Sequence, residues 1–142
     1  MAGADFDSVG MPQEFEFDTA ESFTLTVPTD RLYEIYAIAF RWVCTASAGN
    51  RLIAPTLQGR DSNRLYRRQS QLTLVANDAV RFVWAPGMPD ETAVNAAGQM
   101  LLQPMPLLHL EEGGEVTIED LASIDAADTL VGSISARVYK GE

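Results

Sequence analysis

Apolar and polar residues alternate along most of this chain with a period of two, the spacing of a β-strand that buries one face. The alternation is clear at residues 22–27 and 80–84, and it is most regular in the closing segment, residues 130–138. Turn-forming residues rich in Gly, Pro, Asn and Asp separate these segments. Roughly seven to nine short strands punctuated in this way are typical of a β-sandwich or barrel. The pattern therefore predicts an all-β fold, and we expect an antiparallel β-sandwich.

Some segments depart from simple alternation. Residues 32–45 are apolar on both faces of the predicted strand, which indicates a central strand covered on both sides. A neighbouring subunit could cover the second face. Pro55 places its strand at an edge or a bulge, and the apolar residues 99–110 are broken by prolines into short edge strands. Residues 119–127 follow a sequence that resembles a capping box, so a short helix there stays open as an alternative to a loop.

The strand phases also predict which side chains form the core. Residues of one parity in each strand should face inward. The predicted core comprises Phe23, Leu25, Ile38, Phe40, Trp42, Phe82, Trp84, Ile118, Ile134 and Val138.

The length of 142 residues suits one domain. We expect a single sandwich over residues 21–142, preceded by an extended N-terminal arm at residues 1–20, where Gly, Pro and acidic residues mix without a clear period. Within it, Glu14–Phe17 alternates acids with Phe15 and Phe17, so a short strand could form there on docking. The arm could grip a neighbour or be a frayed terminus. The first residues lack the basic start and apolar run of a signal peptide, and no apolar stretch is long enough to span a bilayer, so we expect a protein made in a cytoplasm with no membrane partner.

Charge is distributed in blocks. The net charge is −10, yet residues 1–30 hold seven acids and no base, residues 31–86 hold eight arginines against three acids, and residues 87–142 hold ten acids against two bases. This charge could be spread over a solvated surface, or acidic termini could meet a basic middle within or between subunits. The overall sign argues against nucleic acid as the main partner.

The sequence offers little catalytic chemistry. His109 is the only histidine and lies beside leucines, and Cys44 lies within an apolar strand, which favours an inert buried thiol. The acids at residues 111–128 do not match an EF-hand, although an irregular calcium site in loops stays possible. Trp42 and Trp84 could form a sugar-stacking platform, but their strand positions favour core packing. We expect no enzyme, no cofactor and no metal site.

The order of several elements is familiar. These elements are Gly49-Asn50-Arg51 after a long aromatic strand, Arg81–Trp84 running into Ala85-Pro86-Gly87, Pro104–Leu108 leading to Gly113-Gly114, and Asp125–Asp128 before the closing strand. In this order, over roughly residues 21–139, the chain resembles small jelly-roll virion proteins of tailed bacteriophages. No single motif carries the resemblance.

The resemblance implies a fold of jelly-roll type and a non-enzymatic protein that decorates or cements a capsid, located in the virion and bound to the major capsid protein or another virion protein. A head–tail or tail component is an alternative, as is a carbohydrate- or receptor-binding sandwich. We expect a homo-oligomer, for which the resemblance implies a trimer. The residues expected at contacts with other chains are Phe6, Phe15, Phe17, Arg60, Arg64, Arg67 and Arg68.

Overall fold

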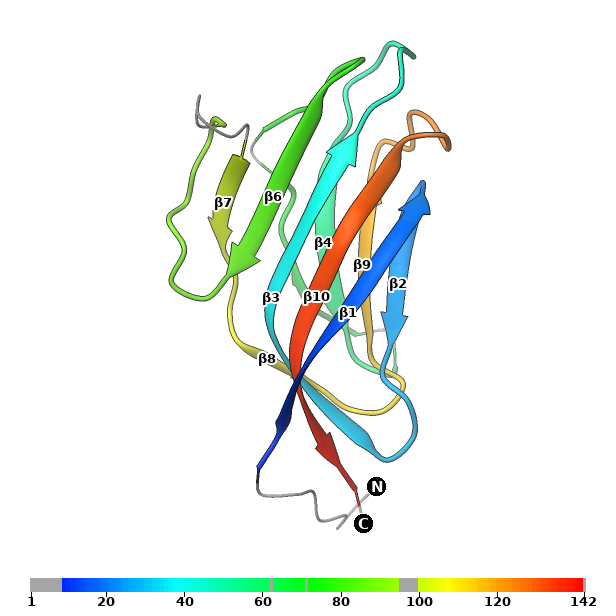
Figure 1. The fold of residues 1–142 in the computed structure, drawn as a ribbon. Coiled ribbons are helices and arrows are strands. Elements are labelled where there is room, and N and C mark those ends of the chain that lie inside the picture. Colours follow the sequence, from blue (N-terminus) through cyan, green and yellow to red (C-terminus); the bar gives the residue numbers. More distant parts are fainter. Residues whose placement is uncertain (1–8, 62, 71, 95–99, 142) are drawn as a thin grey trace.

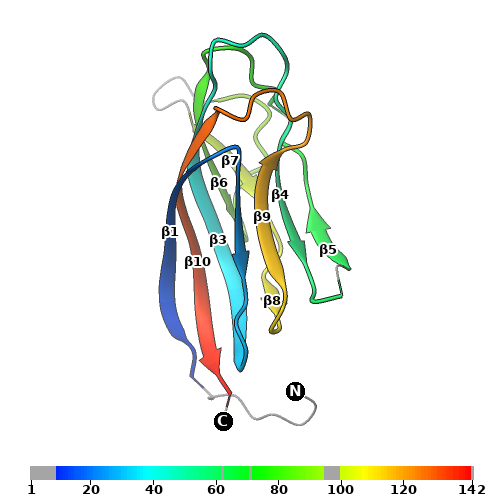
Figure 2. The ribbon, with the colours of Figure 1, turned by 90° about the vertical axis from the view of Figure 1, so that its right-hand side faces the viewer.

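The computed structural model describes residues 9–61, 63–70, 72–94 and 100–141. Over these residues the chain contains strands and turns but no helix, and two sheets face each other as a β-sandwich (Figures 1 and 2). The expected all-β sandwich is therefore confirmed. The helix considered at residues 119–127 does not form, because the chain leaves its strand at Asp120 and turns.

The larger sheet has the strand order β1-β10-β3-β6-β7. Its strands are β1 (Met11–Ala20), β10 (Thr129–Lys140), β3 (Arg31–Val43), β6 (Ala79–Ala85) and β7 (Met100–Pro104), and β8 (Leu108–Leu110) pairs with the beginning of β3. The smaller sheet has the order β2-β9-β4-β5, with β2 (Ser22–Thr26), β9 (Glu115–Asp120), β4 (Ile53–Gln58) and β5 (Arg64–Arg67). The apolar segment 32–45 thus corresponds to β3, which lies in the middle of the larger sheet as predicted. Its second side, predicted to be covered, is not buried within this chain, since Ala37 and Ala39 are only partly buried there and Arg41 is exposed.

One pairing differs from a wholly antiparallel sandwich. β7 runs parallel to β6, in register from Arg81 beside Met100 to Ala85 beside Pro104. A parallel neighbour needs a connection of about a dozen residues or more. The stretch between Ala85 and Met100 is long enough to return the chain to the end of the sheet at which β6 begins. Because β6 and β7 are parallel, the larger sheet is mixed.

The N-terminal boundary also differs from the one expected. Residues 11–20, assigned from the sequence to an arm, form β1 and pair with β10 along their whole length, from Met11 opposite Val138 to Ala20 opposite Thr129. Figure 2 shows β1 as the outer strand of the larger sheet. The sandwich therefore includes at least residues 11–20, and residues 1–8 lie outside the described part.

The core lies between the sheets, and the predicted strand faces are largely confirmed. Eight of the ten predicted residues are buried, namely Ile38, Phe40, Trp42, Phe82, Trp84, Ile118, Ile134 and Val138. Phe40, Phe82 and Trp84 stack with ring centroids 5.2–5.6 Å apart. Phe23 and Leu25 are only partly buried against this core, because β2 is an edge strand that is covered from one side only.

Candidate interaction surface

The larger sheet presents a second, solvent-facing side, which we call the outer face. Because side chains alternate along each strand, every second residue of β1, β10, β3 and β6 lies on it. The outer face comprises Glu14, Glu16 and Asp18 on β1, Val131, Ser133 and Ser135 on β10, Ala37, Ala39 and Arg41 on β3, and Arg81 and Val83 on β6. The register aligns these residues into rows that cross the strands.

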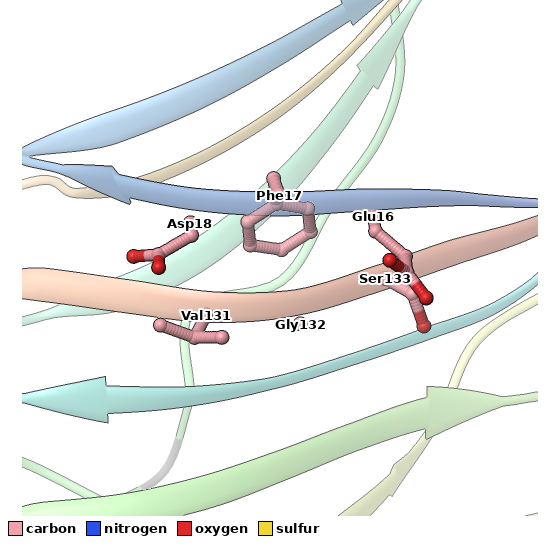
Figure 3. Close-up of a pocket in the computed structure, with 6 residues that line it drawn as sticks. All are labelled: Glu16, Phe17, Asp18, Val131, Gly132 and Ser133. Carbon is pink, nitrogen blue, oxygen red and sulfur yellow. The ribbon is translucent and has the colours of Figure 1, made fainter.

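The middle row of the outer face consists mostly of short side chains. Glu16 lies opposite Ser133, Ser133 opposite Ala39, and Ala39 opposite Val83. Beside them a shallow hollow opens between β1 and β10, with Glu16, Asp18, Val131 and Ser133 around it (Figure 3). Val131 keeps 49% of its surface exposed. A flat, weakly polar centre of this kind can be covered without displacing long side chains.

On the core side of β10, in the row of Phe17 and Phe40, Gly132 allows a close approach of the strands because it has no side chain. A Cβ at Gly132 would collide with the carbonyl oxygen of Ala39 and with the backbone of Phe40. Neither backbone can move without disturbing the pairing of β10 with β3. Gly132 therefore fixes the close approach of the two strands at the centre of the sheet.

Charges of opposite sign flank this centre. Arg41 and Arg81 are directly opposite each other on β3 and β6, and both are exposed. Within the described residues neither has an ion pair or a side-chain hydrogen bond, although like charges directly opposite each other destabilise a sheet. On the far side, the exposed carboxylates of Glu16 and Asp18 likewise have no cationic partner in the described part of the chain. The outer face thus carries unpaired charges of both signs.

The arginines predicted at contacts lie together on the hairpin of β4 and β5, at the end of the smaller sheet (Figure 2). Arg68 pairs with Asp90 of the same chain, with Nη2 2.6 Å from Oδ2, and Arg67 Nε donates to Thr56 Oγ1 at 2.9 Å. Arg60 and Arg64 are exposed and have no such bond to any described residue. The structure brings the four arginines to one hairpin and leaves two of them open to a partner.

The aromatic residues predicted at contacts behave differently. Phe17 is buried and stacks on Phe23 with ring centroids 4.3 Å apart, and Phe15 stacks on Tyr33 at 5.0 Å. These two rings pack against the core of their own sandwich, so they are not free to anchor another chain. Phe6 lies outside the described residues.

The loops at one end of the sandwich are joined by a buried ion pair. The loops that follow β3 and β9 lie at the same end (Figure 1), and Arg51 in the first meets Asp128 in the second. Both side chains are fully buried, with Arg51 Nε 2.9 Å from Asp128 Oδ2 and Nη2 3.2 Å from Oδ1. The remaining guanidinium N–H groups donate to the carbonyl oxygens of Ser47 and Gly49 and to the hydroxyl of Thr45, so every donor of Arg51 is used.

Asp128 is held ionised by its surroundings. Burial alone would raise the pKa of this carboxyl, but hydrogen bonds from Arg51, the backbone N–H of Thr45 and the indole of Trp42 together keep its pKa below the usual value. Burial of a charge is tolerated only when it is paired and hydrogen-bonded in this way. This network fixes the two loops relative to each other.

Two neighbouring aspartates, Asp125 in the second loop and Asp120 at the end of β9, accept hydrogen bonds as well. Asp125 accepts from the hydroxyl groups of Thr45 and Ser47, and Asp120 accepts from the backbone N–H groups of Leu52, Ala122 and Ile124. Among the described residues no group of three or more His, Cys, Asp or Glu side chains is arranged to hold a metal ion.

The remaining candidate residues have structural surroundings. Cys44 is buried, and burial raises the pKa of its thiol to about 11, with a further contribution from the charge of Asp128. The ring of His109 is exposed, and its Nε2 lies 2.7 Å from Glu34 Oε2. Trp42 and Trp84 are fully buried, so neither offers the sugar-stacking platform considered from the sequence. No helix in the described part of the chain is long and apolar enough to cross a membrane.

Sequence reasoning misses the charged residues of the outer face. Arg41 and Arg81 stand between buried neighbours, which marks them as outward-facing, but their direct opposition depends on the register of β3 with β6. The acids of β1 fall in the segment assigned to an arm, so their place beside β10 is not predicted. The alternation of Phe15 and Phe17 with the neighbouring acids allows a short strand there, but it does not identify β10 as the strand's neighbour.

Comparisons with known proteins add no assignment: a scan against models of protein families finds no match for this chain, and a search of curated proteins finds no similar one.

Proposed function

We propose that this protein is a non-enzymatic structural module that acts by binding other protein chains, as a decoration or cement protein of a tailed-phage capsid. The observation that carries the proposal is the outer face, where short side chains are flanked by unpaired charges of both signs. Such a surface suits a protein partner, because specific interfaces combine a small desolvated centre with a polar rim.

The strand order supports the finer part of the proposal. The strands in the order β1-β10-β3-β6 face the strands in the order β2-β9-β4-β5. Along the chain, β1 to β4 therefore alternate between the larger and the smaller sheet, and β9 and β10 also lie in different sheets. Eight strands in this order are what we expect of a jelly roll, a fold that occurs in viral capsid and lectin domains. The sequence resemblance to small jelly-roll virion proteins points the same way, although a shared fold alone does not assign a function.

The hairpin of β4 and β5, which carries the exposed Arg60 and Arg64 and is called the basic hairpin below, is a second surface for contacts within a virion. Arg60 and Arg64 project from the end of the smaller sheet with no partner among the described residues. Repeated copies on a lattice would add their separate contacts through avidity. A carbohydrate-binding role shares the argument from the fold, since jelly rolls also occur in lectins, but it lacks the sugar-stacking platform because both tryptophans are in the core.

The test is binding to capsid particles that lack this protein, measured by co-sedimentation. Ala39→Lys places a long charged side chain at the centre of the outer face, and Thr24→Lys makes a comparable exposed change on β2 of the smaller sheet. Wild type and Thr24→Lys should bind to a saturating copy number, and Ala39→Lys should bind at least tenfold more weakly. Absence of saturable binding by folded wild-type protein, or equal binding by both variants, would contradict the proposal.

A further inference from the structure

We infer that a second copy of this chain covers the outer face, around a two-fold axis that runs parallel to the strands between β10 and β3. The inference deepens the proposed function and rests on it, since it names the first partner of the same surface. It commits to a dimer, in place of the trimer that the resemblance implies.

The charges on the outer face favour this occupant. One row of the sheet runs Asp18, Val131, Arg41, Arg81 from β1 to β6. Over these four strands the row has an unpaired anion on β1 and two unpaired cations on β3 and β6, and it continues to Met100 on β7. A partner that satisfies both ends must carry cations over β1 and anions over β6. The same row in a second copy rotated by 180° has that arrangement, because its Arg81 lies over β1 and its Asp18 lies over β6.

The symmetry follows from the register. In a two-fold contact, if one residue meets a second, the second also meets the first in the other copy. An axis midway between β10 and β3 lays β1 of one copy over β6 of the other, and β10 over β3. Asp18 then lies over Arg81 twice, and Ser133 lies over Ala39 twice. The short side chains at the centre let the sheets approach, and the charges meet at both sides.

Edge protection and nucleic-acid binding each account for only part of the charge pattern. Acidic residues on an edge strand such as β1 discourage pairing with another edge, but this does not explain why Arg41 and Arg81 lie opposite each other. A nucleic acid could use the two arginines, but the carboxylates of Glu16 and Asp18 on the same face would repel its phosphates. A copy of the same surface offers Asp18 a cation and Arg81 an anion at the same time, while Arg41 lies over Val131.

The size of the face sets the expected affinity. Four strands at about 4.8 Å spacing and three rows at about 6.8 Å spacing give a surface of roughly 20 Å by 20 Å. This is about 400 Å² from each copy, or about 800 Å² in total, which is below the roughly 1,200 Å² of a standard specific interface and typical of weak, transient contacts. We therefore expect a dimer with a dissociation constant in the micromolar range, weakened by salt because its charged pairs lie at the rim.

The test exploits the symmetry. Asp18→Arg should weaken the dimer at least tenfold, because the introduced guanidinium would face Arg81 of the other copy. Arg81→Asp should do the same, because Asp18 would then face a second carboxylate. An equimolar mixture of the two variants should form a heterodimer that is stronger than either variant's own dimer and close to wild type. One of its outer contacts keeps the native pair of Asp18 with Arg81, and the other joins the two introduced, opposite charges. Dissociation constants are measured by sedimentation equilibrium, with circular dichroism confirming that each variant is folded.

The charge-swapped double variant completes the test, and two hairpin variants are its matched controls. Asp18→Arg combined with Arg81→Asp in one chain restores opposite charges at both contacts, so its dimer should return to near wild-type affinity. The controls Asp61→Arg and Arg64→Asp, exposed charge reversals on the basic hairpin, should leave the dimer unchanged. A wild-type protein that stays monomeric at millimolar concentration would overturn the inference. So would single variants that dimerise like wild type, or a double variant that dimerises no better than the single ones.

Particle binding separates this outcome from that of the proposed function. Monomeric protein that binds capsids through the outer face would refute the dimer and leave the proposed function standing. Dimers that do not bind capsids would support the two-fold contact and refute the proposed function.

Discussion

The buried ion pair between Arg51 and Asp128 gives the sharpest stability prediction. Asp128→Ala removes the carboxylate that accepts two bonds from Arg51 and leaves the guanidinium fully buried without its counter-charge. The backbone N–H of Thr45 and the indole N–H of Trp42 lose their acceptor as well. The two loops would then have to rearrange to admit water.

The cost can be bounded from burial. Removing one partner of a buried pair typically costs about 3–5 kcal/mol, because an uncompensated charge remains inside. The pair of Arg68 with Asp90 serves as an internal comparison, since its side chains are 29% and 45% exposed. Breaking a pair that is exposed to this degree costs at most about 1 kcal/mol. With a total stability of about 5–15 kcal/mol for a domain of this kind, Asp128→Ala should remove about a fifth of it or more.

The assay is urea unfolding at neutral pH, followed by tryptophan fluorescence, for wild type, Asp128→Ala and Arg68→Ala. We expect a large fall in the unfolding free energy for Asp128→Ala and a small one for Arg68→Ala. The double variant Arg51→Met with Asp128→Ala should recover part of the loss, because the stranded charge is removed. A loss below about 1 kcal/mol for Asp128→Ala would refute the role assigned to the pair.

Three further predictions concern other residues. Hydrogen bonds from the hydroxyl of Thr45, the N–H of Ala127 and the hydroxyl of Ser47 lower the pKa of Asp125 to about 2, so its stabilisation is complete above about pH 4 and is lost as the pH falls through 2. Urea unfolding between pH 5 and pH 2 should therefore show a smaller decline for Asp125→Asn than for wild type, and equal declines would contradict the assignment. The raised pKa of Cys44 should make its labelling by a disulfide reagent about a hundredfold slower in native than in unfolded protein, and rapid native labelling would show the thiol to be accessible. Arg64→Glu should weaken binding to capsid particles more than Lys140→Glu, and equal binding would show that the basic hairpin faces solvent.

The fold class and most of the core were predictable from the sequence, because burial of one strand face imposes a period of two. The placement of β3 in the middle of the larger sheet follows from its two apolar sides in the same way. β1 was harder to place, since Phe15 and Phe17 could equally dock on a neighbour, and only pairing with β10 settles the matter.

The candidate site was less predictable because it depends on which residues meet across strands. Arg51 lies 77 residues from Asp128 in sequence, and nothing local distinguishes it from the exposed arginines of the same basic block. The opposition of Arg41 and Arg81 is likewise a property of register, which apolar spacing does not specify for outward-facing residues.

The most direct test of the account is electron cryomicroscopy of capsid particles reassembled with this protein. The account predicts density for the β-sandwich on the capsid surface, at regular positions, with the outer face of the larger sheet against another protein chain. Particles that carry no ordered sandwich, or sandwiches whose outer face is turned to solvent, would contradict it.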